Sequence, residues 1–237
     1  MNNEDYLKKH LPKDKLEGGL RRLKLGESPQ YIVGNVNFYG YDLKVNKNVL
    51  IPRFETEELV EKTINLAKKY NFFNPKILDI GTGSGAIAIA LYKNLSKDVT
   101  ALDVSKEALD VSKENALLND ADIKFVHSDI FSNVDNKFDI IISNPPYIDE
   151  NDDIEDIVLN NEPKEALFAP NNGLYFYEEI IKNSNKYLND KFLIVFEIGM
   201  TQGRAITELA KKYFPNAKII CEKDLSKKDR FVFILNA

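Results

Sequence analysis

Short apolar runs alternate with longer amphipathic stretches from about residue 56 to the end of the chain. Apolar residues recur at helical spacing in the longer stretches, and the runs between them have strand length. This alternation predicts strands joined by helical crossovers, and hence an α/β fold with a parallel, doubly wound sheet. Strands are expected at 76–80, 99–102, 123–127, 138–143, 192–197, 217–221 and 231–235, and helices at 56–70, 85–94, 106–119, 174–188 and 202–213.

The two strands expected nearest the C-terminus, 217–221 and 231–235, have only residues 222–230 between them. A connection of this length is too short for a helical crossover. We therefore expect these two strands to pair antiparallel, unlike the rest of the sheet.

The first part of the chain has a different texture. Residues 1–28 are charged and weakly periodic, which predicts at most one or two short helices. From residue 31 to 51 β-branched and aromatic residues, interrupted by glycines, predict a β-hairpin or a small meander. The expected organisation is a short helical segment at 1–28, a hairpin linker at 29–55 and the main α/β domain at 56–237.

Composition narrows the class of protein. A chain of 237 residues is long enough for one sizeable core. The single cysteine, Cys221, fits a reducing compartment, and the polar start and absence of a long apolar stretch predict a cytoplasmic enzyme with no membrane association. The net charge of −5 argues against a broad phosphate-binding surface, so no stable binding of nucleic acid is expected.

A glycine-rich loop follows the first strand of the main domain. The segment reads LDIGTGSG and contains Asp79, Gly81, Thr82, Gly83, Ser84 and Gly85. Alternate glycines let the backbone turn sharply and approach a ligand closely. The G-x-G-x-G spacing differs from the dinucleotide fingerprint G-x-G-x-x-G, which disfavours an oxidoreductase. The Asp79 carboxylate would repel a pyrophosphate but suits a ligand that carries an ammonium group.

Acidic residues also follow the next two strands. Asp103 is placed to accept hydrogen bonds from ribose hydroxyls, as carboxylates at this position of related folds do. Asp129 is placed to accept from an adenine amino group, and Ile130 to lie against the ring face. Each acid alone is typical of a loop or a helix cap, but the set at successive strand ends favours S-adenosylmethionine as the cofactor.

The segment Asn144-Pro145-Pro146-Tyr147 directly follows the apolar run at 138–143. Proline fixes the backbone and leaves carbonyl acceptors without a competing N–H, while the Asn144 carboxamide both accepts and donates. These groups form a stiff pair of acceptors suited to a planar NH₂ group, with an aromatic ring beside it. The alternative interpretation of an isolated N-P-P is a rigid turn from strand to loop.

Together the segments at 79–85, 103, 129 and 144–147 resemble class I methyltransferases that act on planar nitrogens. Further segments resemble the HemK/PrmC family, which methylates N5 of the glutamine in the Gly-Gly-Gln motif of peptide chain release factors. They are SPQYIVG at 28–34, FYG at 38–40, VLIPRFETE at 49–57, EPKEAL at 162–167, FEIG at 196–199 and QG at 202–203. The resemblance extends from about residue 26 to the C-terminus.

The resemblance implies a role for each matching residue. Gly81 to Gly85 would hold the methionine moiety of the cofactor, Asp103 its ribose, and Asp129 and Ile130 its adenine. The NPPY segment, residues 144–147, would hold the substrate amide and border the cofactor. We expect the Asn144 side-chain oxygen and the Pro145 carbonyl each to accept one N–H of the substrate, with Tyr147 against the amide plane. The family usually carries a longer helical N-terminal domain that helps to dock the release factor, of which residues 1–28 would be a reduced form.

Two other functions remain open from sequence. An adenine-N6 methyltransferase acting on DNA or RNA would use the same N-P-P-Y chemistry, although it would need a surface for backbone phosphates. A cofactor-binding protein without activity would not need the intact segment 144–147.

Several side chains admit two interpretations. Arg53 is either part of the pocket wall or a surface ion-pair partner, and Glu197 either lines the pocket or caps a helix. The acidic segment 149–156 is either a mobile flap or a solvated loop. Cys221 is expected to be a small buried residue on a strand. His10 and His127 have no partner at metal-ligand spacing, so no metal site is expected.

Overall fold

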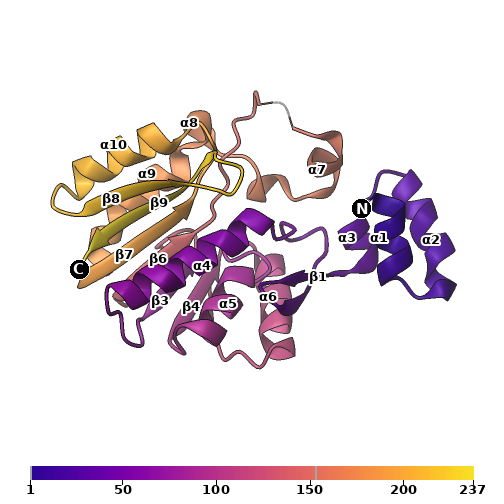
Figure 1. Ribbon diagram of the computed structural model, residues 1–237, viewed down its shortest axis with the longest axis horizontal. Helices are drawn as coiled ribbons and strands as arrows, with labels where there is room; N and C mark the ends of the chain where they lie inside the picture. The colour runs from indigo at the N-terminus through magenta and orange to yellow at the C-terminus, as the bar shows by residue number, and fades with distance from the viewer. Residues whose placement is uncertain (1, 153) are drawn as a thin grey trace.

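The protein is described here by a computed structural model covering residues 2–152 and 154–237. The strands of the main sheet are β3 (Ile77–Ile80), β4 (Val99–Asp103), β5 (Lys124–His127), β6 (Phe138–Ser143), β7 (Leu188–Glu197), β8 (Lys218–Lys223) and β9 (Asp229–Asn236). The longer helices of the main domain are α4 (Phe54–Lys69), α5 (Ala86–Asn94), α6 (Lys106–Leu118), α9 (Tyr175–Asn183) and α10 (Gly203–Tyr213). These elements confirm the predicted α/β class (Figure 1).

The seven strands form one sheet in the order β5-β4-β3-β6-β7-β9-β8. The five strands from β5 to β7 are parallel, whereas β9 pairs antiparallel with both β7 and β8. The antiparallel pairing expected of the last two strands is therefore confirmed. The strand order reverses between β3 and β6, and a crevice outside the carboxyl ends of the strands is expected at such a point.

Alternate residues of the sheet pack into two separate apolar layers, one on each face. Ile140 and Ile142 of β6 face the layer that includes α4 and α5, whereas Ile141 faces the layer with α9 and α10. All three side chains have no exposed surface. Burial on both faces explains why these strands are continuous apolar runs in the sequence.

The N-terminal segment consists of short helices and a hairpin that lie to one side of the main sheet (Figure 1). They are α1 (Asn3–His10), α2 (Lys13–Lys24), α3 (Pro29–Val33), β1 (Asn35–Phe38) and β2 (Tyr41–Lys44). Two short helices within residues 1–28 and the hairpin were expected. The expectation of β structure from residue 31 is wrong, because Pro29 begins a helical turn that ends at Gly34 in a left-handed conformation.

The connection between β6 and β7 contains short helical turns. They are α7 (Asp156–Asn161), η1 (Lys164–Ala166), α8 (Pro170–Gly173) and η2 (Ser184–Tyr187). The helix expected at 174–188 therefore ends earlier, at Asn183, and continues as a 3-10 turn. The strand expected at 192–197 instead begins at Leu188, which pairs with Phe138 across a register shift.

Two further observations concern the surface. Cys221 is exposed on β8, so the expectation that it is buried is wrong: β8 is the edge strand of the sheet and has a neighbour on one side only. None of the helices in the described residues has the length and apolar character needed to cross a membrane.

Candidate active site

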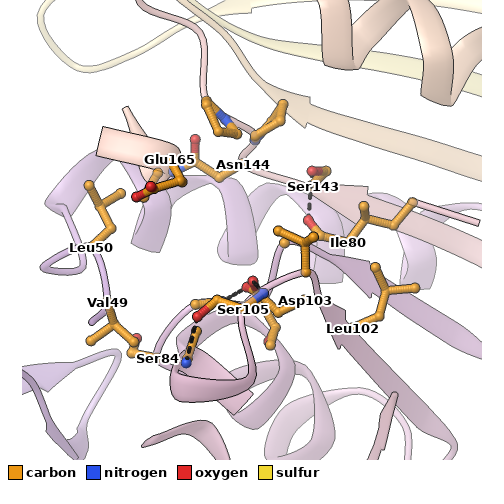
Figure 2. A pocket seen from close by; sticks show the side chains of 18 of the residues that line it. Val49, Leu50, Ile80, Ser84, Leu102, Asp103, Ser105, Ser143, Asn144 and Glu165 are labelled. Atoms are coloured by element: carbon orange, nitrogen blue, oxygen red, sulfur yellow. Dashed lines mark hydrogen bonds between the residues drawn. The ribbon is translucent and has the colours of Figure 1, made fainter. Parts of the chain in front are cut away.

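A cavity of about 790 Å³ lies at the carboxyl ends of β3, β4 and β6, where the strand order reverses. Its walls come from the glycine loop after β3, the ends of β4 and β6, residues 47–52 and residues 163–166. Figure 2 shows Asn144 and Glu165 on one side of this space, and Ser84, Asp103 and Ser105 on the other. Volume and position are those of a small-molecule site in an open α/β sheet.

The glycine loop forms the floor of the cavity. Gly81 and Gly83 have φ angles of 72° and 54°, which L side chains rarely adopt. A Cβ added to either glycine would meet no atom within 4 Å, so the backbone faces open space that a ligand can occupy. Thr82 and Ser84 also line the cavity, and both are nearly buried.

Asp79 lies beneath this loop and is not among the described residues that line the cavity. Its side chain has no exposed surface, and its Oδ2 accepts a hydrogen bond from Thr82 Oγ1 at 2.7 Å. The other oxygen, Oδ1, has no hydrogen-bond partner among the described residues. Burial is the main cause that raises the Asp79 pKa to about 7, and the nearby Asp103 adds to it. A direct contact of Asp79 with an ammonium group stays a prediction.

Asp103 ends β4 and lines the cavity, and its contact with a ribose stays a prediction. Its Oδ2 accepts from the Gly83 amide and its Oδ1 from the Ser105 amide, both at 2.9 Å. These bonds fix the carboxylate against the glycine loop, and each oxygen keeps a lone pair for a further donor. Burial raises the pKa of Asp103 above its ordinary value, although the backbone donors oppose this shift.

Asp129 and Ile130 follow β5 and also line the cavity. Ile130 has a φ of 46°, an uncommon conformation for a β-branched residue. Ser128 holds this turn, because its hydroxyl donates to the Ile130 carbonyl at 3.0 Å and accepts from the Asn133 amide at 3.0 Å. The strained turn brings Ile130 to the cavity wall, beside the exposed Asp129.

The segment Asn144-Pro145-Pro146 enters the same cavity from the end of β6. The Ser143 hydroxyl donates to the Ile80 carbonyl at 2.7 Å, which ties the end of β6 to the residue before the glycine loop (Figure 2). The two predicted acceptors, Asn144 and Pro145, therefore lie on the wall of the cavity whose floor is Gly81 and Gly83.

Tyr147 takes a different position from the rest of this segment. It is not among the described residues that line the cavity, and its ring packs against the apolar layer of α9 and α10. Its carbonyl accepts a hydrogen bond from Gln202 Nε2 at 2.9 Å. An added Cβ at Gly173 would lie 2.0 Å from the same carbonyl, so this approach requires glycine. Contact of the Tyr147 ring with a substrate amide stays a prediction.

Glu197, interpreted from sequence as a pocket wall or a helix cap, is not among the described residues that line the cavity, and it pairs with Thr56, whose role the sequence did not indicate. Thr56 lies in the first turn of α4, lines the cavity, and donates to Glu197 Oε2 at 2.7 Å. Glu197 ends β7, and its side chain is almost fully buried. Burial raises its pKa to about 7, with smaller opposing effects of Thr56 and Arg230. An acid at the end of an otherwise apolar strand was the available signal.

Arg53 forms an ion pair with Glu162 at 2.5 Å, and Glu162 is 6% exposed. Glu162 also accepts from the Ile51 amide at 3.2 Å. Residues 47–52 and 163–166 form two walls of the cavity. Glu162 lies next to the second wall and contacts both Arg53 and the Ile51 amide, so its side chain links the two walls. Of the two interpretations of Arg53, the ion pair is confirmed, but with a buried partner.

The doubly wound sheet, the glycine loop and acids at successive strand ends define a Rossmann-like methyltransferase. In agreement, a family model described as "Methyltransferase small domain" matches residues 56–168. A Streptococcus pneumoniae protein named release factor glutamine methyltransferase is 44% identical over 217 residues, which are 90% of this chain and 77% of that protein. A Bacillus subtilis protein of the same name is 42% identical, with coverage of 90% and 76%. The chain belongs to the release factor glutamine methyltransferase family.

Solved structures agree on the fold. The Thermus thermophilus 16S rRNA N2 G1207 methyltransferase, solved with S-adenosylmethionine and guanosine, superposes with a TM-score of 0.60. The two chains are 14% identical, and the match covers 86% of this chain and 50% of that one. The methyltransferase class implies S-adenosylmethionine as the methyl donor, and the open glycine floor and the Asp103 carboxylate fit that molecule.

Proposed function

We propose that this protein transfers a methyl group from S-adenosylmethionine to the side-chain amide nitrogen of the glutamine in the Gly-Gly-Gln motif of peptide chain release factors. The observation that carries the proposal is that the Asn144 and Pro145 acceptors share one cavity with the glycine loop. The names of the relatives supply the substrate class. The cofactor supplies an electrophilic methyl group.

The cofactor half of the cavity is assigned by the donors and acceptors that line it. Gly81, Thr82, Gly83 and Ser84 would hold the methionine moiety. Gly85, at the start of α5, and Asp79, beneath the loop, are not among the described residues that line the cavity and would support the loop. Asp103 would accept from the ribose hydroxyls. Asp129 would accept from the adenine amino group, and Ile130 would contact the ring.

The substrate half must orient a poor nucleophile. An amide nitrogen shares its lone pair with the carbonyl, so the site has to align the NH₂ group and stabilise the positive charge that develops on it. Asn144 Oδ1 and the Pro145 carbonyl would each accept one N–H. S-adenosylmethionine bound beside these acceptors would supply the methyl group to the amide nitrogen, and water would take the proton that the methylated amide loses. Alignment of this kind lowers a barrier by roughly 7–11 kcal/mol in favourable cases.

The decisive experiment uses labelled cofactor with a release factor and with its Gln→Ala variant at the Gly-Gly-Gln motif. Label on the first protein only is the expected result. Transfer of label to DNA or RNA, with none on the release factor, would instead identify an adenine methyltransferase.

Two variants test the division of the cavity into halves. Asn144→Ala should lower kcat by about 10²–10³-fold, because the acceptor acts mainly in the transition state. Its affinity for the cofactor, measured by calorimetry, should change little. Asp103→Ala should weaken cofactor binding instead. Equal effects of both variants on binding and turnover would contradict the assignment.

A further inference from the structure

The Asn144 side chain is held by a directed chain of hydrogen bonds. Its Nδ2 donates to Thr56 Oγ1 at 3.2 Å, and Thr56 Oγ1 donates to Glu197 Oε2 at 2.7 Å. These three residues come from the loop after β6, the first turn of α4 and the end of β7. Thr56 is 5% exposed and Glu197 is 2% exposed, so water has little access to either group.

The direction of this chain follows from proton counting. A hydroxyl has one proton, and the Thr56 proton is used on the Glu197 carboxylate. Thr56 Oγ1 can then only accept from its other neighbour, which must be the NH₂ end of Asn144. The Asn144 oxygen is turned away from Thr56 as a result, and it accepts no hydrogen bond from the described residues. A carboxylate at one end therefore fixes a free acceptor at the other.

Such control matters because a carboxamide is nearly symmetric in shape. Rotation by half a turn exchanges its oxygen and its NH₂ group, so the hydrogen-bond partners decide which end faces the cavity. Only the orientation with the oxygen toward the cavity accepts a substrate N–H. The reverse orientation would place one NH₂ group against another.

The charged and titratable groups around Glu197 come from four elements. They are Glu55 of α4, Tyr147 after β6, Tyr177 of α9 and Arg230 of β9. Arg230 favours the carboxylate from a distance, but its guanidinium donates to the Ile198 carbonyl at 3.1 Å and to Asp224 at 3.3 Å. Thr56 donates to Glu197 at 2.7 Å, and the Asn144 NH₂ group lies close enough to the same carboxylate to favour its ionised form. A buried acid with a raised pKa beside a cavity is a candidate for a functional group.

We propose that Thr56 and Glu197 are positioning residues, which set the orientation of the Asn144 carboxamide so that its oxygen accepts the substrate NH₂ group. This inference rests on the proposed function and deepens it. Neither residue needs to touch the substrate. Their effect is transmitted through the hydroxyl proton and requires Glu197 to be ionised.

The test compares Thr56→Val, Thr56→Ser and Glu197→Gln with the wild type. Methylation of a release factor is measured at saturating cofactor, and cofactor affinity by calorimetry. Thr56→Val keeps the shape of the side chain but removes the link, so kcat should fall about 10–100-fold, the range for residues that orient a functional group. Thr56→Ser restores the hydroxyl and should recover most of the rate. Cofactor affinity should stay near that of the wild type in all variants.

Thr63→Val is the matched control. Thr63 is buried in the same helix, and its hydroxyl donates only to the Leu59 carbonyl within the described structure, at 2.7 Å. It should lose stability without a comparable loss of kcat. If Thr63→Val and Thr56→Val lose kcat equally, or Thr56→Val keeps the full rate, the positioning role is wrong while the proposed function stands. A wild-type protein that leaves the glutamine unmodified would overturn both.

The pH profile is a readout that a purely structural role would not move. Wild-type kcat should fall as the pH drops through about 7. A protonated Glu197 no longer needs the Thr56 hydroxyl as a donor, so Thr56 no longer fixes the orientation of Asn144. Glu197→Gln has no such group, so its rate should be low and its pH dependence weaker than that of the wild type, with only the part due to Asp79, whose pKa is also about 7, left. A Glu197→Gln variant with the wild-type rate and pH profile would refute the mechanism, even if Thr56→Val fails to fold.

Discussion

Replacement of Glu197 by Gln should change how the free energy of unfolding depends on pH. The Glu197 pKa is raised from 4.5 to about 7 in the folded protein, chiefly by burial. A raised carboxyl pKa means that the folded state binds the proton more tightly than the unfolded chain does. The stabilisation from this proton is complete below about pH 4.5 and is lost as the pH rises through about 7.

The magnitude follows from the size of the shift. At 1.36 kcal/mol per unit, a shift from 4.5 to about 7 corresponds to about 3 kcal/mol in total. Between pH 5 and pH 8 the wild type should lose about 2.5 kcal/mol of this contribution. The carboxyl is 2% exposed, so solvent screening reduces the figure little.

The assay is urea unfolding of the wild type and Glu197→Gln, without cofactor, at intervals from pH 5 to pH 8. Gln does not titrate, so the variant should gain stability relative to the wild type across this range. Asp79, whose pKa is also raised to about 7, is present in both proteins and cancels in the difference. Any fixed cost of the new NH₂ group is the same at every pH.

The refuting result is a difference in unfolding free energy that stays constant within about 0.5 kcal/mol from pH 5 to pH 8. Glu197 would then be an ordinary ionised side chain that carries no burial penalty. The expected outcome is a variant that is relatively more stable at high pH yet slower in catalysis. Such a trade is typical of strained active-site groups.

Two further predictions concern the walls of the cavity. Gly173→Ala should lower the melting temperature and reduce methylation at least about tenfold. The reason is that the added Cβ would lie 2.0 Å from the Tyr147 carbonyl and 2.6 Å from Gln202 Nε2. An unchanged melting temperature would show that the backbone at Gly173 can shift to accept a side chain. Arg53→Met should lower the free energy of unfolding by about 2–3 kcal/mol, because it leaves the buried Glu162 carboxylate without its ion-pair partner. Adding Glu162→Gln should recover part of this loss in urea unfolding, and a purely additive double variant would contradict the pairing.

The parallel strands could be predicted because their burial leaves a direct trace in the sequence. Ile140 to Ile142 face two different apolar layers, so all three central positions of the strand must be apolar. The ligand-facing loops could be placed for a related reason, since parallel strands bring their carboxyl ends to one edge. This logic located Gly81, Asp103 and Asn144 on one cavity.

Other features leave no such trace. The helical turn at Pro29 depends on local capping, which a texture of aromatic and β-branched residues obscures. The early start of β7 includes Asn189-Asp190-Lys191, whose polar side chains resemble a turn, and it depends on pairing across a register shift. The link between Thr56, Asn144 and Glu197 joins residues that are 88 and 141 positions apart. No spacing rule predicts contacts of that kind.

The sequence nevertheless carries one physical signal for contacts of this kind. Asp79 lies in the apolar strand β3 and Glu197 ends the apolar part of β7, residues 192–197, and both are almost completely buried. Burial without full hydrogen bonding destabilises a fold, so such an acid persists only where something else is gained. Asp79 supports the glycine loop through Thr82, and Glu197 reaches Asn144 through Thr56. In both cases a threonine hydroxyl donates to the buried carboxyl group and thereby connects it to the loop that faces the cavity. An acid inside an apolar strand next to a ligand-binding loop is therefore a reason to look for the hydroxyl that it controls.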